Sequence, residues 1–134
     1  EVETAVLGNR WPELAAVGEI LSGAEFYDYK AKYTDDSGTV LSKPAELSGE
    51  TCGEIRDLAR RAYMALDCSG YARIDFFIDK KTGKVYINEI NTIPGFTKYS
   101  MFPLLWKEAG VPFGELIERI VDLGYERYYA KNNR

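Results

Sequence analysis

Side chains that could bind a metal ion fall within two short segments rich in aromatic and β-branched residues. Asp75 lies in the first segment, and Glu89 and Asn91 lie in the second. If the two segments pair as a β-hairpin, Asp75 faces Glu89, and facing carboxylates repel each other unless something offsets their charge. Carboxylate and amide oxygens are ligands of Mg²⁺, whose sites keep room for water and substrate phosphates. The pattern therefore predicts a site for a hard divalent cation, Mg²⁺ or Mn²⁺.

Arg73 and Phe77 lie two residues to either side of Asp75, so strand alternation places all three on one face. A guanidinium in this position is suited to hold a phosphate group. Phe77 could lie against a nucleobase or another apolar group. The same pattern also fits a solvated sheet face that carries one arginine–carboxylate pair.

Two positions after Asn91 add further possibilities. Gly95 permits a close approach of the backbone, and a free amide there could donate to a developing oxyanion. Ser100 precedes a predicted helix, whose N-terminus favours a carboxylate or a phosphate. Both residues also fit ordinary structural roles, as a turn glycine and an N-cap.

A β-hairpin formed by residues 71–79 and 84–91 must position these groups. A three-residue loop, 81–83, would put Gly83 at the left-handed position of a bulged turn. This loop predicts the facing pairs Lys80 and Lys84, Ile78 and Tyr86, Asp75 and Glu89, and Arg73 and Asn91. It also places Ile87 on the same face as Glu89 and Asn91.

The remaining elements surround this hairpin. Residues 55–66 have the apolar period of a helix, with Ser48 as N-cap and Gly70 beyond the end. Further helices are predicted at 101–109 and 113–130, and β-prone stretches at 1–7 and 17–21. Residues 25–44 show no period and carry tyrosines among charged residues, which is typical of a functional loop or a surface loop. We expect an α+β fold over residues 1–134, a largely antiparallel sheet with helices packed on one face.

Composition excludes several classes of protein. The 134 residues suit one globular domain, with 46% hydrophobic and 28% charged residues. The net charge of −4 and the absence of a basic patch argue against a nucleic-acid binder. No apolar run approaches the roughly 18 residues of a membrane-spanning helix. Histidine is absent, so any catalysis must use carboxylates, Lys, Arg, Tyr, backbone amides or a hard metal ion.

The two cysteines, Cys52 and Cys68, flank the helix predicted over 55–66. At about 1.5 Å of rise per residue they lie far beyond the ~7 Å limit for a disulfide. Two free thiols favour a reducing cytoplasm. The N-terminal residues lack the regions of a secretory signal and begin without Met, so we expect a processed chain or a part of a longer one.

Three runs of residues together resemble the C-terminal signature of the D-alanine–D-alanine ligases, ATP-grasp enzymes of peptidoglycan precursor synthesis. They are residues 73–75 (RID), 88–97 (NEINTIPGFT) and 100–101 (SM). Residues 26–33 (FYDYKAKY) are similar to the family's mobile loop, so a mobile active-site loop is expected at about 25–44. Glu1 with residues 5–9 is similar to the strand that carries a nucleotide-contacting glutamate.

The resemblance implies a role for each matching residue. Asp75, Glu89 and Asn91 would hold two Mg²⁺ or Mn²⁺ ions that bridge the phosphates of ATP. Arg73 would stabilise the transferring phosphoryl group and the tetrahedral intermediate. The amide of Gly95 would serve the oxyanion.

It also implies the contacts to both substrates. Ser100 would bind the carboxylate of the second D-alanine, and Tyr33 would help close the loop over the substrates. Lys32 would reach the γ-phosphate, Phe77 would line the adenine pocket, and Glu1 would contact the nucleoside.

The family's N-terminal domain and its central glycine-rich phosphate loop have no counterpart in this sequence. We therefore expect a C-terminal fragment of a longer ligase that is inactive alone. Its expected partners are ATP, D-alanine and the missing portions of the same enzyme. The longer ligase could form a homodimer. Three alternatives stay open: a ligase that adds D-lactate or D-serine, another ATP-grasp carboxylate–amine ligase, and a non-catalytic nucleotide- or metal-binding module. Tyr33 within the intact 27–33 run favours D-alanine, and the long match over 26–101 argues against other ATP-grasp ligases.

Overall fold

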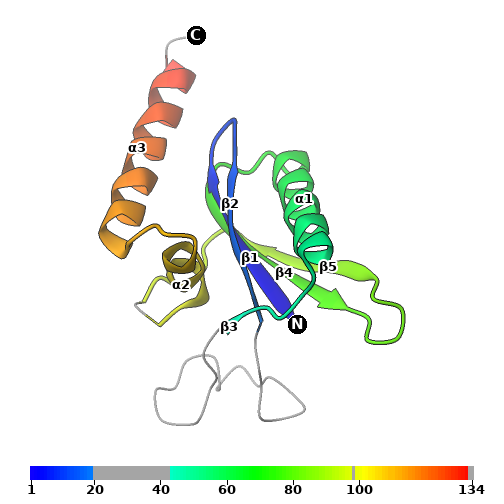
Figure 1. Ribbon diagram of the computed structural model, residues 1–134. Helices are drawn as coiled ribbons and strands as arrows, with labels where there is room; N and C mark the ends of the chain where they lie inside the picture. Colours follow the sequence, from blue (N-terminus) through cyan, green and yellow to red (C-terminus); the bar gives the residue numbers. More distant parts are fainter. Residues whose placement is uncertain (20–42, 98, 133–134) are drawn as a thin grey trace.

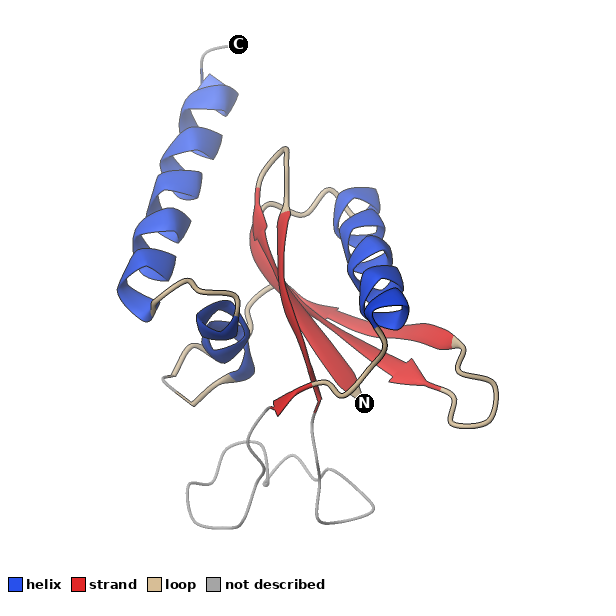
Figure 2. Cartoon of the chain, viewed as in Figure 1, coloured by secondary structure: helices blue, strands red, loops and turns tan. Residues whose placement is uncertain are grey.

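The computed structural model describes residues 1–19, 43–97 and 99–132. In chain order the elements are β1 (Val2–Gly8), β2 (Glu13–Glu19), β3 (Lys43–Pro44), α1 (Gly49–Ala65), β4 (Gly70–Ile78), β5 (Val85–Asn91), α2 (Met101–Glu108) and α3 (Phe113–Asn132) (Figure 2). The irregular segment expected at 25–44 lies outside the described residues except for β3. No helix among the described residues is long and apolar enough to cross a membrane.

The strands form one sheet in the order β3-β2-β1-β4-β5, and every neighbouring pair is antiparallel. The central strand β1 pairs with β2 on one side and β4 on the other (Figure 1). This confirms the expected α+β class and the antiparallel sheet. The second strand covers Glu13–Glu19 rather than residues 17–21, so β1 and β2 form a hairpin with a short turn.

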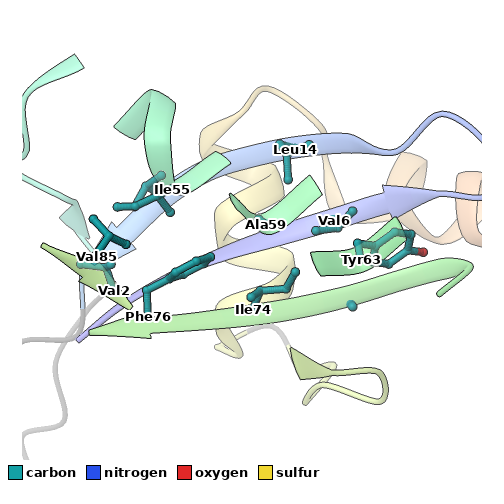
Figure 3. Close-up of a cluster of buried hydrophobic side chains, with 11 residues drawn as sticks. Val2, Val6, Leu14, Ile55, Ala59, Tyr63, Ile74, Phe76 and Val85 are labelled. Carbon is teal, nitrogen blue, oxygen red and sulfur yellow. The ribbon is translucent and has the colours of Figure 1, made fainter. Parts of the chain in front are cut away.

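Helix α1 packs against one face of the sheet. It begins after Ser48, whose Oγ accepts a hydrogen bond from the amide of Thr51 at 3.1 Å, as expected for an N-cap. Its buried residues Ile55, Ala59 and Tyr63 contact apolar side chains from the strands (Figure 3). The strand residues in this core are Val2, Val6, Leu14, Val17, Ala72, Ile74, Phe76 and Val85.

Helices α2 and α3 lie on the opposite face (Figure 1), so the expectation that all helices share one face is wrong. Phe102, Leu105 and Trp106 of α2 pack with Leu116 of α3 against Ala5, Leu7 and Ala15 of the sheet. The reason lies in β1, where every residue from Val2 to Gly8 is buried. A strand that is apolar on both faces needs cover on both sides.

The turn of the β4–β5 hairpin is one residue longer than expected. The amide of Asp79 donates to the carbonyl of Lys84 at 2.9 Å, so the loop consists of residues 80–83. The Asp79 carboxylate accepts bonds from the amides of Lys81 and Thr82, each at 2.8 Å, which favours the longer loop. Gly83 has φ +71°, the left-handed conformation that the sequence predicted.

A β-bulge in β5 restores the predicted register before the candidate site. Near the turn the pairs are Ile78–Val85, Phe77–Tyr86 and Phe76–Ile87. The predicted pairing of Ile78 with Tyr86 is therefore wrong, and Ile87 faces the α1 side with Phe76 instead of the site face. Asn88 is the extra residue of the bulge, and beyond it Asp75 faces Glu89 and Arg73 faces Asn91, as predicted.

Candidate active site

Three carboxylates form a row across neighbouring strands on the sheet face away from α1. The register pairs Glu3 of β1 with Asp75 of β4, and Asp75 with Glu89 of β5. Glu3 and Asp75 are 1% and 0% exposed, whereas the Glu89 side chain is 54% exposed. Because facing carboxylates repel, and burial strengthens the repulsion, this row needs a cation.

Arg73 supplies that cation from the next position along β4. Its Nε donates to Asp75 Oδ1 and its Nη2 to Oδ2, both at 2.8 Å, which is a bidentate pair. Oε2 of Glu3 lies 3.0 Å from Nε, and Oε1 of Glu89 lies 3.9 Å from Nη2. The predicted arginine–carboxylate pair is present, but it is buried rather than part of a solvated sheet face.

The surrounding charges keep Arg73 ionised despite its burial. Loss of solvent by itself lowers the pKa of a guanidinium, because burial disfavours the charged form. The hydrogen bond with Asp75 and the negative charges of Glu3, Asp75 and Glu89 raise the pKa by more, so the net shift is upward. The site therefore holds a permanent positive charge beside carboxylates.

The predicted metal ligands lie together on this face. Asn91 pairs with Arg73 in the strand register, directly beside the pair of Asp75 and Glu89. Oδ1 of Asn91 accepts a bond from the amide of Ile93 at 3.1 Å, which ties the end of β5 to the following loop. Two carboxylates and an amide are chemically suited to a hard divalent cation. Among the described residues no group of three Cys, His, Asp or Glu side chains could by itself hold a metal ion.

Half-exposed aromatic rings extend the site toward the hairpin turn. Phe77 and Tyr86 face each other, and each is 48% exposed. Nζ of Lys84 lies 5.2 Å from the centre of the Tyr86 ring. Glu1 precedes β1, and continuing the pairing of Val2 with Phe76 by one residue brings Glu1 alongside Phe77. Both residues expected to contact the nucleoside therefore belong to one corner of the sheet.

Gly95 and Ser100 are brought together in the loop before α2. A Cβ atom placed on Gly95 would lie 3.0 Å from Ser100 Oγ, so a side chain would crowd this contact. Ser100 occupies the N-cap position, but its side chain makes no capping bond. Its Oγ accepts from the amide of Thr97 at 3.0 Å and lies 2.9 Å from Thr97 Oγ1. The alternative that Ser100 is an ordinary capping side chain is therefore not supported, because its hydroxyl bonds to Thr97 within the loop.

Aromatic packing fixes this loop to the domain. The ring of Phe96 lies 5.6 Å from that of Phe102 and 5.5 Å from that of Phe113. It also makes an edge contact with Tyr71 at 6.2 Å. Rings from β4, α2 and α3 thus hold the residue next to Gly95, so the neighbouring amide has a defined position.

Glu3 is the residue of this site that the sequence analysis missed. It stands in β1 between Val2 and Thr4 without a recognisable motif, and only the pairing of β1 with β4 brings it to Arg73. A charged residue in a strand that is otherwise apolar on both faces was the available signal. Lys32 and Tyr33 lie outside the described residues.

The antiparallel sheet with its helices has the architecture of the C-terminal part of ATP-grasp ligases. It superposes on the D-alanine–D-alanine ligase of Coxiella burnetii with a TM-score of 0.83 and 33% identity, covering 98% of this chain and 33% of that one. Residues 1–122 match the family described as "D-ala D-ala ligase C-terminus", and the chain belongs to this family.

Similar proteins are named as ligases, and the chain spans about a third of their length. It is 58% identical over 128 residues to a D-alanine–D-alanine ligase of Acetivibrio thermocellus, covering 96% of this chain and 34% of that protein. A D-Ala:D-Ser ligase from Enterococcus faecalis, VanG, is 35% identical with a TM-score of 0.74, and the match covers 91% of this chain and 35% of that one. The resemblance found in the sequence is confirmed.

Proposed function

We propose that this chain forms the C-terminal part of the active site of a D-alanine–D-alanine ligase. In that reaction ATP phosphorylates the carboxylate of one D-alanine, which yields ADP and an acyl phosphate. The amine of the second D-alanine then attacks the acyl carbon, the dipeptide bond forms, and phosphate leaves. The observation that carries the proposal is the buried Arg73 beside Asp75, Glu89 and Asn91 in a chain of this family.

Asp75, Glu89 and Asn91 would hold Mg²⁺ or Mn²⁺ at the edge of the Arg73 site. When bound, the ion neutralises charge on the phosphates of ATP. Both oxygens of Asp75 already accept bonds from Arg73, and each keeps lone pairs for a further ligand. Glu89 is the more exposed carboxylate of the set and can turn toward an ion without leaving a buried pair.

Arg73 acts on the transferring phosphoryl group and on the tetrahedral intermediate. Its charge is permanent and its guanidinium is held by Asp75, so it needs little reorganisation when negative charge develops. The amide of Gly95 donates to the oxyanion of the intermediate, which suits a loop held by the Phe96 ring. Ser100 contributes its hydroxyl to the carboxylate of the second D-alanine.

The nucleoside of ATP lies along the aromatic corner of the sheet. Phe77 offers an exposed ring to adenine, and Tyr86 lies opposite to it. Glu1 contacts the nucleoside from the start of β1. Lys32 at the γ-phosphate and Tyr33 in the closing loop remain predictions from the sequence. The free thiols Cys52 and Cys68 support a cytoplasmic location, and a homodimer also remains a prediction.

A D-Ala:D-Ser ligase is the second candidate because VanG shares the fold at 35% identity. The D-alanine–D-alanine ligases of Acetivibrio thermocellus and Ruminiclostridium cellulolyticum are closer, at 58% and 51% identity, which favours D-alanine as acceptor.

The test uses a complete ligase. We define this as the longer enzyme that contains the chain, or the Acetivibrio thermocellus ligase with its matching 128-residue segment replaced by this chain. Phosphate release is measured with ATP, Mg²⁺ and D-alanine, and mass spectrometry identifies the product formed with D-alanine, D-serine or D-lactate. We expect D-alanyl-D-alanine as the main product. A complete ligase that binds ATP but releases no phosphate with any acceptor would refute the proposal.

A further inference from the structure

Glu3 is a buried carboxylate in contact with Arg73, and its position in the fold is unusual. It lies on β1, the central strand, with 1% of its surface exposed. Its Oε2 lies 3.0 Å from Nε of Arg73, whereas Asp75 approaches the same guanidinium from β4 itself. The guanidinium is therefore held by carboxylates from two different strands.

The contacts of Arg73 divide its nitrogens into two groups. Asp75 accepts from Nε and Nη2, and Glu3 lies against Nε. None of these contacts uses Nη1. Because the guanidinium is planar, fixing the Nε and Nη2 edge also fixes the direction in which Nη1 points. The two bonds to Asp75 therefore set where the remaining nitrogen can meet a phosphate oxygen, and the ion pair with Glu3 supports that position from a second strand.

The ion pair between Glu3 and Arg73 is most important when Asp75 binds both Arg73 and a metal ion. With a divalent cation bound as proposed, the charge of Asp75 would be partly neutralised, and this carboxylate would attract the guanidinium less strongly. Glu3 belongs to no ligand set proposed above, and its charge would stay directed at Nε. Removing that charge would let the side chain of Arg73 move toward the phosphates or away from them.

We propose that Glu3 is a positioning residue, which holds the guanidinium of Arg73 at Nε so that Nη1 stays aimed at the transferring phosphoryl group. This inference rests on the proposed function, because it needs Arg73 to act on that group. Glu3 belongs to none of the substrate contacts proposed above, and its described contact is the ion pair with Arg73. It acts through Arg73, so its effect must disappear when the guanidinium fork is absent.

The test is a double-mutant cycle in the complete ligase with Glu3→Gln, Arg73→Lys and the combined variant. Glutamine keeps the size of the side chain and removes its charge, and lysine keeps the charge of Arg73 without the fork. We expect Glu3→Gln to lower kcat about 10- to 100-fold, since small misplacements of a reacting group cost this much. The KM for ATP should change less than about threefold. In the Arg73→Lys background the same change should lower kcat less than about twofold.

Glu13→Gln is the matched control. Glu13 is also a strand carboxylate paired with an arginine, with Oε2 3.3 Å from Nη1 of Arg119, but it is exposed and belongs to β2. Its substitution should leave kcat within about twofold of wild type. If Glu3→Gln does not fold, Glu3→Asp enters the same cycle, because aspartate keeps the charge and shortens the reach by one methylene. It should also lower kcat, because the carboxylate then lies farther from Nε, and again only in the presence of Arg73.

Two results would overturn the inference. One is an unchanged kcat in the folded Glu3 variant, and the other is an equal loss of kcat with Arg73 and with Lys at position 73, which a purely structural role would produce. These outcomes differ from failure of the proposed function, in which the unmutated complete ligase makes no D-alanyl-D-alanine. That result would overturn both the proposed function and the role of Glu3.

Discussion

Asp75 accepts two parallel hydrogen bonds from Arg73, each 2.8 Å long, although the two residues are only two positions apart on the same strand. Strand alternation sends both side chains to one face, and the buried position of Asp75 leaves Arg73 as its cationic partner among the described residues. Asp75 therefore has two roles, because the same carboxylate holds Arg73 in the fold and belongs to the candidate metal ligands.

Asp75→Asn should destabilise the isolated chain by about 1–3 kcal/mol, the usual contribution of a buried hydrogen bond to a charged group. Glu89→Gln should cost much less, because the Glu89 side chain is half-exposed and lies 3.9 Å from Arg73. Chemical denaturation of the two variants beside wild type measures the difference. Equal stability losses in both variants would show that burial of Asp75 is not what makes its pairing strong.

Glu89→Gln should weaken binding of Mn²⁺ at least about tenfold while leaving the fold intact, because it removes one of the charged oxygen ligands. Paramagnetic relaxation of water protons measures Mn²⁺ binding to the 134-residue chain. Glu13→Gln is the control for nonspecific loss of negative charge, since Glu13 lies on β2 away from the candidate ligands. An affinity that falls equally in both variants would argue against a defined site.

Gly18→Ala should destabilise the chain by about 1–3 kcal/mol, as overpacking of a core does. A Cβ atom on Gly18 would lie only 2.6 Å from Cδ2 of Leu105, so the buried Leu105 side chain would have to shift within the core. Gly53→Ala is the matched control, because Gly53 lies within α1 and a Cβ atom there meets nothing within 4 Å.

The control should stabilise the chain by about 0.5–1 kcal/mol, since alanine favours the helix over glycine. Thermal unfolding of both variants gives the sign of each effect. A Gly18→Ala variant as stable as wild type would contradict the tight contact between Gly18 and the Leu105 side chain.

Asp79 should make the stability of the hairpin depend on pH. Hydrogen bonds from Thr82 and Lys81 to its carboxylate hold the pKa of Asp79 below its ordinary value. A group whose pKa is lower in the folded state stabilises the fold above its unfolded-state pKa, and this contribution is lost as the pH falls through its folded-state pKa. Asp79→Asn should remove this part of the acid sensitivity, which urea unfolding between roughly pH 6 and 2 would measure. Identical pH profiles for variant and wild type would contradict the assignment.

The sequence could predict the pairing at the site because two local deviations offset each other. The hairpin loop has one residue more than the sequence suggested, since Asp79 bonds to two loop amides, and the bulge at Asn88 returns the register. The position of α2 and the contact of Glu3 with Arg73 could not be predicted. Both depend on how β1 pairs with its neighbours, and a strand buried on both faces shows no alternation from which to assign its sides.

The most direct measurement of the central claim is D-alanine-dependent phosphate release by the complete ligase carrying Arg73→Ala. Arg73 is proposed to act mainly in the transition state, so turnover should fall by at least about 10²- to 10³-fold while ATP still binds. Glu13→Gln, assayed beside it, should remain close to wild type. The account predicts that result, and an Arg73→Ala enzyme that keeps most of its turnover would contradict it.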